Sequence, residues 1–142
     1  MALLEAKKDP VPMTNVTQKR PLSPHLQIYK FTPTFLMSGF HRVTGFGLYF
    51  GAVLIVWWLM AAASGEAYFD WVSGIFGSWF GLFVLFCFSW ALVHHLLGGI
   101  KHLAWDIGYG FEKERATRVA QLQIISSVVL TVAVWIIGYL AA

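Results

Sequence analysis

The chain has 142 residues, of which 58% are hydrophobic and only 12% are charged, and its formal net charge is +3. A soluble domain of this size does not bury so much apolar surface, so the composition excludes an ordinary soluble domain and indicates a membrane protein. The positive charges flank the apolar segments, and we interpret them as a signal of membrane topology and not of nucleic-acid binding.

A polar N-terminal segment, residues 1–33, contains all 5 prolines of the chain. Its part RPLSPHLQIY, at 20–29, combines two prolines, which favour extended backbone, with apolar side chains that need a surface to cover them. We predict that 20–29 forms a docking strap on the cytoplasmic or matrix face of the membrane domain. On these residues alone, an ordinary proline-rich linker fits equally well.

Three long stretches, 43–65, 71–100 and 119–142, contain no Asp, Glu, Lys or Arg. Each is long enough for an α-helix to cross about 30 Å of hydrocarbon, which takes about 20 residues. We therefore predict an all-α transmembrane domain over 34–142. Its three helices are expected at about 36–63, 71–104 and 117–141.

The charges also predict the orientation of the chain. Every Lys and Arg precedes or begins the first predicted span, or lies in the region from the end of the second span to the start of the third. The only charged residues in the connection between the first two spans are the acidic residues Glu66 and Asp70. By the positive-inside rule, the N-terminus faces the cytoplasm or matrix and Ala142 faces the opposite side. The absence of an Arg-rich, acid-poor presequence favours a bacterial inner membrane over a mitochondrial one.

The second predicted span ends in HHLLGGIKHLAWD, which brings ionisable groups into an apolar helix. At about 100° per residue, Gly99, His102 and Asp106 fall within about 40° of His95, whereas His94 is rotated by about 100°. Ionisable groups inside a membrane indicate function by default. A haem fits this stripe, because neutral imidazole binds iron and glycine leaves room for a flat group. For His95 alone, a hydrogen bond to a neighbouring helix is an equal alternative, and for His94 it is the favoured one.

A second polar group begins the first predicted span, in SGFHRVTG. Ser38, His41, Arg42 and Gly45 follow i, i+3, i+4, i+7 spacing and therefore share one side of the helix. With the predicted topology, they lie at the same depth as the end of the second span. Two helices are thus expected to form one shallow polar pocket.

The segments RPLSPHLQIY, SGFHRVTG and HHLLGGIKHLAWD, in this order, resemble the cytochrome-b-type large membrane-anchor subunits of succinate dehydrogenase, respiratory complex II. In that family the first histidine of H-x-x-x-G-x-[RK]-H is an axial ligand of the haem iron. The resemblance assigns this role to His95, with Gly99, Lys101 and His102 completing the pattern. Lys101 stands where arginine is more usual, which retains the charge but not the fork geometry.

The resemblance implies that this chain and a smaller membrane subunit share haem b, with the smaller subunit supplying the second axial ligand. It implies flavoprotein and iron-sulfur partners that oxidise succinate, ubiquinone as the electron acceptor, and no activity of the isolated chain. Ser38 and Arg42 are expected to line the quinone site, and His41, Arg42 and His102 to approach the haem propionates. We add Asp106 and His102 as a proton relay, from their polarity and position.

Two alternatives belong to other classes. In the first, the chain is a haem-free membrane anchor or packing subunit whose histidines only join helices. In the second it is a di-haem, quinol-oxidising cytochrome b, which needs four axial histidines deep in the membrane. His25, His41 and His102 lie at or outside the inner edge, so too few remain. A freestanding enzyme is also disfavoured, because the sequence has no flavin, nucleotide or cluster motif.

Overall fold

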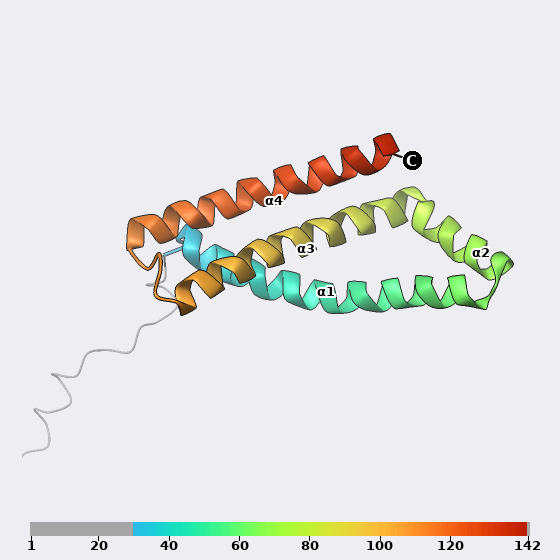
Figure 1. The fold of residues 1–142 in the computed structure, drawn as a ribbon, viewed down its shortest axis with the longest axis horizontal. Coiled ribbons are helices and arrows are strands. Elements are labelled where there is room, and N and C mark those ends of the chain that lie inside the picture. Colours follow the sequence, from blue (N-terminus) through green and yellow to red (C-terminus); the bar gives the residue numbers. More distant parts are fainter. Residues whose placement is uncertain (1–29, 142) are drawn as a thin grey trace, which may run out of the picture. The chain divides into compact units, whose positions relative to one another are not determined.

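The structure, a computed structural model, describes residues 30–141; the predicted docking strap at 20–29 lies outside the described residues. The described part consists of helices α1 (Pro33–Ser64), α2 (Glu66–Gly77), α3 (Trp79–Asp106) and α4 (Lys113–Ala141), without a strand (Figure 1). Helices α1, α3 and α4 are long and apolar enough to cross a membrane. The predicted all-α fold with three transmembrane helices is therefore confirmed.

Helix α1 begins a few residues earlier than the sequence predicted, because a local cap starts it. The Thr32 side chain accepts a hydrogen bond from the backbone N–H of Phe35 at 3.3 Å, and Pro33 occupies the first turn. Both features are typical of a helix N-terminus. Ser38 and Arg42 consequently lie within the first three turns of α1, at one end of the bundle.

The predicted helix over 71–104 is interrupted. Ser78 has extended backbone, with ψ of 159°, and separates α2 from α3. Its hydroxyl oxygen accepts a hydrogen bond from the Gly81 N–H at 3.1 Å, which caps α3. Gly81 packs so closely against the carbonyls of Ile75 and Phe76 that a Cβ there would overlap them. The chain therefore turns sharply between the two helices.

Helix α2 has 12 residues, too few for the about 20 that cross a bilayer, and it packs against the end of α1. The Trp57 indole donates a hydrogen bond to the Tyr68 hydroxyl at 2.9 Å, and the Trp58 indole donates to Ser73 Oγ at 3.3 Å. Val72 of α2 is fully buried. Such aromatic side chains favour the membrane interface, which fits a short helix between two spans.

Helix α3 packs against both other long helices (Figure 1), and glycines allow its close approach to α1. A Cβ at Gly51 would overlap the Phe88 ring, and a Cβ at Gly45 would lie 2.9 Å from Cε1 of His95. Small residues at helix contacts are common in membranes, where dispersion and hydrogen bonds drive association. The α1–α3 contact therefore depends on residues without a side chain.

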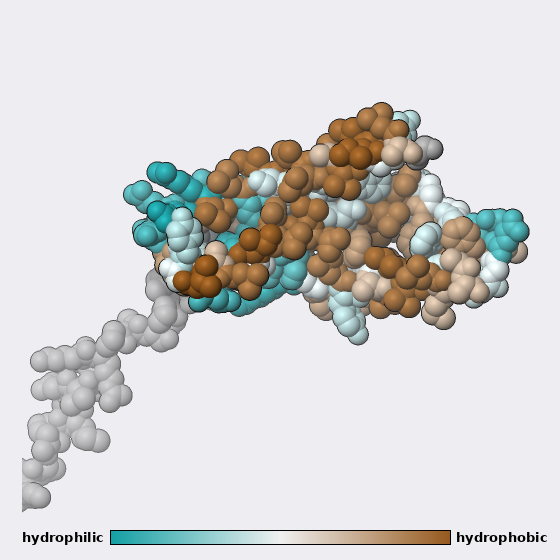
Figure 2. Space-filling model, in the orientation of Figure 1, coloured by the Kyte–Doolittle hydropathy of each residue, from teal (hydrophilic) through white to brown (hydrophobic). Residues whose placement is uncertain are grey.

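Most large apolar side chains point outward. Val43, Phe46 and Ile137, for example, are each at least 65% exposed. Figure 2 shows hydrophobic residues over much of the visible face of the long helices, with hydrophilic residues gathered where α4 begins and around α2. Water does not favour such a surface, whereas lipid or other transmembrane helices cover it.

An odd number of spans predicts opposite locations for the two ends of the chain. Fused at the N-terminus, a green fluorescent reporter should be active inside, and alkaline phosphatase fused after Ala142 should be active outside. The reciprocal fusions should be inactive, because each reporter matures on one side only. If both ends report the same compartment, one of the three helices does not cross the membrane.

Candidate functional site

Three histidines from two helices meet near one end of the bundle. The His41 ring of α1 stacks on the His95 ring of α3, with centroids 3.9 Å apart and planes 6° from parallel. His102, further along α3, lies 5.2 Å from the His41 ring. The sequence predicted these residues in two separate motifs. The structure brings all three together, and we call them the histidine cluster.

The hydrogen bond of His95 defines which ring nitrogen is free. Its Nδ1 lies 3.1 Å from the backbone carbonyl oxygen of His41, and a carbonyl only accepts hydrogen bonds. Nδ1 therefore carries the proton in the neutral ring, and Nε2 keeps an unshared electron pair. No hydrogen bond reaches this Nε2 from any residue in the described range 30–141. A histidine that ligates a metal commonly has this arrangement, with the other nitrogen bonded to a carbonyl.

The adjacent His94 faces the other way, toward α4, and is 1% exposed. The Gln123 amide nitrogen lies 3.3 Å from both the His94 carbonyl oxygen and His94 Nε2, so the amide donates and Nε2 accepts. His94 Nδ1 then donates to Ser127 Oγ at 3.2 Å. Both ring nitrogens are used in joining α3 to α4, which leaves none for a metal.

Two consecutive glycines of α3 have different surroundings. A Cβ at Gly98 would lie 2.5 Å from Nδ1 of His41, so this glycine allows His41 to approach α3. A Cβ at Gly99 would meet no atom within 4 Å. Sequence reasoning selected Gly99 as the source of open space and overlooked Gly98 as the close contact. It also overlooked Thr44, whose Oγ1 lies 3.4 Å from Nδ1 of His95.

The four residues predicted to share one side of α1 are divided between two environments. His41 and Gly45 contact α3, whereas Ser38 and Arg42 are exposed. The physical reason is angular: at about 100° per residue, the four positions spread over about 100° of the helix surface. Arg42 forms no ion pair with any residue between 30 and 141. Both exposed residues are therefore available to a lipid-soluble ligand or another chain.

The end of α3 distributes its polar residues in a similar way. The His102 ring lies 5.2 Å from that of Trp105, and Asp106 is exposed as the last residue of the helix. Lys101 is only 7% exposed and lies 4.9 Å from the Trp105 ring. The structure therefore places His102 in the histidine cluster, Asp106 at the helix end, and Lys101 on the side of α3 that faces α4.

The residues present fit the haem that the sequence resemblance implies. His95 offers a free Nε2, a Cβ at Gly99 would meet no atom within 4 Å, and His41 Nδ1 is buried with no hydrogen-bond partner among residues 30–141. Within 30–141, no group of three or more His, Cys, Asp or Glu side chains is arranged to hold a metal ion by itself. Iron in a porphyrin takes only its axial ligands from protein, so one histidine from this chain meets the requirement.

The fold and the histidine cluster define a class of protein. It is an integral membrane protein of three spans, in which the first two spans contact each other through histidines near one end of the bundle. Residues 16–134 match the family of succinate dehydrogenase/fumarate reductase transmembrane subunits. The chain belongs to this family, which confirms the resemblance stated from its motifs.

Relatives of the chain include bacterial proteins and a mitochondrial protein. The chain is 43% identical over 120 residues to the succinate dehydrogenase cytochrome b556 subunit of Paracoccus denitrificans, covering 84% of this chain and 92% of the relative. It is 36% identical over 128 residues to the subunit of the same name from Rickettsia prowazekii, covering 87% and 100%. To the mitochondrial succinate dehydrogenase cytochrome b560 subunit of Mus musculus it is 36% identical over 98 residues, covering 68% and 58%.

Proposed function

We propose that the chain is the large membrane-anchor subunit of a succinate:ubiquinone oxidoreductase, in which it binds haem b and helps form the ubiquinone-reducing site. Family membership and the names of the relatives support the assignment to this complex. The observation that carries the haem assignment is the geometry of His95, whose Nδ1 is bonded to a carbonyl and whose Nε2 is free.

In this proposal, His95 is the residue of this chain that would bind the haem iron. Haem b, when bound, supplies an iron that exchanges single electrons. The hydrogen bond from His95 Nδ1 to the His41 carbonyl orients the imidazole and makes Nε2 a stronger electron-pair donor to a metal. His41, Arg42 and His102 would hold the propionates. Both nitrogens of His94 are engaged, so a second iron ligand would come from the smaller membrane subunit.

Ser38 and Arg42 bind the quinone headgroup. Both are exposed in the first turns of α1, so a lipid-soluble molecule reaches them from the bilayer. The Ser38 hydroxyl donates a hydrogen bond to a quinone carbonyl, and the Arg42 guanidinium stabilises the oxyanion that develops as the quinone is reduced. Asp106, at the exposed end of α3, and His102, inside the histidine cluster, relay protons from the aqueous phase.

The remaining subunits perform the first half of the reaction. A flavoprotein oxidises succinate and an iron-sulfur subunit conducts the electrons to the membrane, while this chain anchors the assembly in the bilayer and has no activity in isolation. We assign the complex to the bacterial cytoplasmic membrane. The Paracoccus and Rickettsia relatives support this assignment.

Affinity purification through a tag on this chain tests the proposal. A flavoprotein, an iron-sulfur protein and a second small membrane protein should co-purify. The dithionite-reduced minus oxidised spectrum should show the Soret and α bands of a b-type haem. The same subunits without haem bands would support the haem-free anchor instead, and isolation without these subunits would contradict the assignment to the complex.

A further inference from the structure

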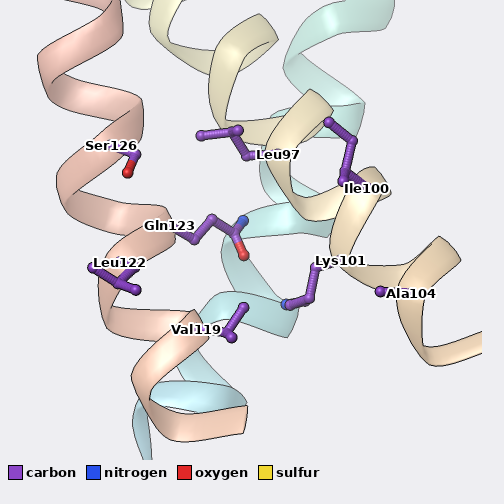
Figure 3. Close-up of a pocket in the computed structure, with 8 residues that line it drawn as sticks. All are labelled: Leu97, Ile100, Lys101, Ala104, Val119, Leu122, Gln123 and Ser126. Carbon is purple, nitrogen blue, oxygen red and sulfur yellow. The ribbon is translucent and has the colours of Figure 1, made fainter. Parts of the chain in front are cut away.

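A pocket of about 300 Å³ lies between α3 and α4. Its walls are mainly apolar and include Leu97, Ile100, Val119 and Leu122. Two polar side chains enter it from opposite helices: Figure 3 shows Lys101 of α3 and Gln123 of α4 extending toward each other. None of these six residues belongs to the histidine cluster or to the proposed quinone site.

Lys101 is a buried cation without a carboxylate. Only 7% of the residue is exposed, and the Trp105 ring lies 4.9 Å from its Nζ. The two ion pairs among residues 30–141, Arg115 with Glu112 and Arg118 with Glu114, do not include it. A cation in a membrane helix is costly unless an anion or another electron-rich group accompanies it. The ring meets this need only in part, so the pocket favours an anionic ligand.

Gln123 contributes a free hydrogen-bond acceptor. The residue is 4% exposed, and its amide nitrogen donates to His94, as described above. Its Oε1 is buried and has no hydrogen-bond partner in the described chain. An unpaired buried acceptor is unfavourable, and a ligand with a hydroxyl group would satisfy it.

The pocket lies toward the end of the bundle at which α3 ends and α4 begins. Lys101 lies five residues before the end of α3, or about 7.5 Å along its axis, and Gln123 lies ten residues, about 15 Å, from the start of α4. The Lys101 side chain is long enough to carry its ammonium group further toward the aqueous edge. The predicted topology places this end of the helices on the inner side, where anionic lipids interact with basic groups.

We propose that the pocket binds an anionic glycerophospholipid whose headgroup carries a hydroxyl, as in phosphatidylglycerol. The Lys101 ammonium donates hydrogen bonds to a phosphate oxygen, and Gln123 Oε1 accepts one from the headgroup hydroxyl. An acyl chain lies along the apolar wall of α3 and α4. Basic pockets between transmembrane helices recognise lipid headgroups by this chemistry.

Native mass spectrometry of the intact, delipidated complex tests the proposal. The complex is titrated in detergent with dioleoylphosphatidylglycerol or dioleoylphosphatidylcholine. Wild type should retain phosphatidylglycerol in preference to phosphatidylcholine, and Lys101→Gln should weaken this binding at least about fivefold, the effect of losing one favourable lysine contact. Lys113→Gln is the matched control, because it removes the same charge from an exposed position at the start of α4. Lys101→Arg should retain binding.

Equal retention of the two lipids by wild type would overturn the proposal, as would equal binding by Lys101→Gln and Lys113→Gln. Displacement of the lipid by excess inorganic phosphate would show that the pocket recognises free phosphate and would also overturn it. If a carboxylate of another subunit fills the pocket, wild type shows no preference for phosphatidylglycerol, which again contradicts the proposal. Should Lys101→Gln fail to assemble, the lipid preference of wild type and of Lys101→Arg still decides the question.

Discussion

His95→Ala should remove the haem b spectrum from the assembled complex, whereas His94→Ala should leave it in place. The two residues are neighbours in sequence, but only His95 has a free Nε2, and both nitrogens of His94 are hydrogen-bonded to α4. His94→Ala removes the ring partners of Gln123 and Ser127, which keep their bonds to the backbone carbonyls of residue 94 and Ile124. Each lost hydrogen bond typically contributes about 0.5–1.5 kcal/mol. We therefore expect His94→Ala to lower the thermal stability of the complex while retaining haem.

The measurement is haem per complex, from the pyridine haemochrome assay normalised to the flavin or the total protein of the purified complex. Normalisation separates loss of haem from loss of yield. In His95→Gly, added imidazole should restore part of the spectrum, because a free ligand replaces the missing side chain. Equal haem loss in both alanine variants, or a normal spectrum without His95, would overturn the ligand assignment.

Arg42→Ala should abolish most ubiquinone reduction without affecting succinate oxidation by a soluble artificial acceptor. Loss of one charged contact to a developing oxyanion typically lowers the rate about 100- to 1000-fold. The artificial acceptor takes electrons before they reach the membrane site, so its reduction should continue. Arg42 is exposed on α1 and has no ion pair among the described residues, so its removal breaks no ion pair described within the chain.

The ratio of quinone reductase to artificial-acceptor activity is the quantity to measure, in complex with normal subunit content. Ser38→Ala should lower the same ratio less, because a neutral hydrogen bond contributes about 0.5–1.5 kcal/mol. Lys113→Gln serves as the control for loss of a positive charge at the same end of the bundle. A proportional decrease of both activities in Arg42→Ala would indicate a role in assembly and contradict the quinone-site role.

The transmembrane fold could be predicted from the sequence because lipid imposes a uniform requirement. A helix that crosses it must be long and nearly free of charge, and the stretches 43–65, 71–100 and 119–142 satisfy this condition without any tertiary information. Helical periodicity alone also predicted that His94 and His95 would face different directions. The structure shows the first against α4 and the second against α1.

Features that depend on contacts between helices could not be predicted in this way. The interruption at Ser78 lies in a stretch without charge or proline, and it depends on how Gly81 packs against α2. The partners of His94 lie 29 and 33 residues further along the chain. Their pairing requires the register of α3 against α4, which no local pattern encodes. The separation of Ser38 and Arg42 from His41 likewise depends on which part of the polar side of α1 meets α3.

His94 and His95 point in different directions, so the contacts of α3 with α4 and with α1 depend on the same rotation of α3. Because their side chains leave the helix about 100° apart, an axial rotation that turned His95 away from α1 would also pull His94 out of its bonds with Gln123 and Ser127. These bonds restrict the rotational freedom of α3, and with it the direction of the imidazole one residue later. His95, the proposed haem ligand, is thus preorganised by its neighbour His94. Less conformational entropy is then lost when haem binds.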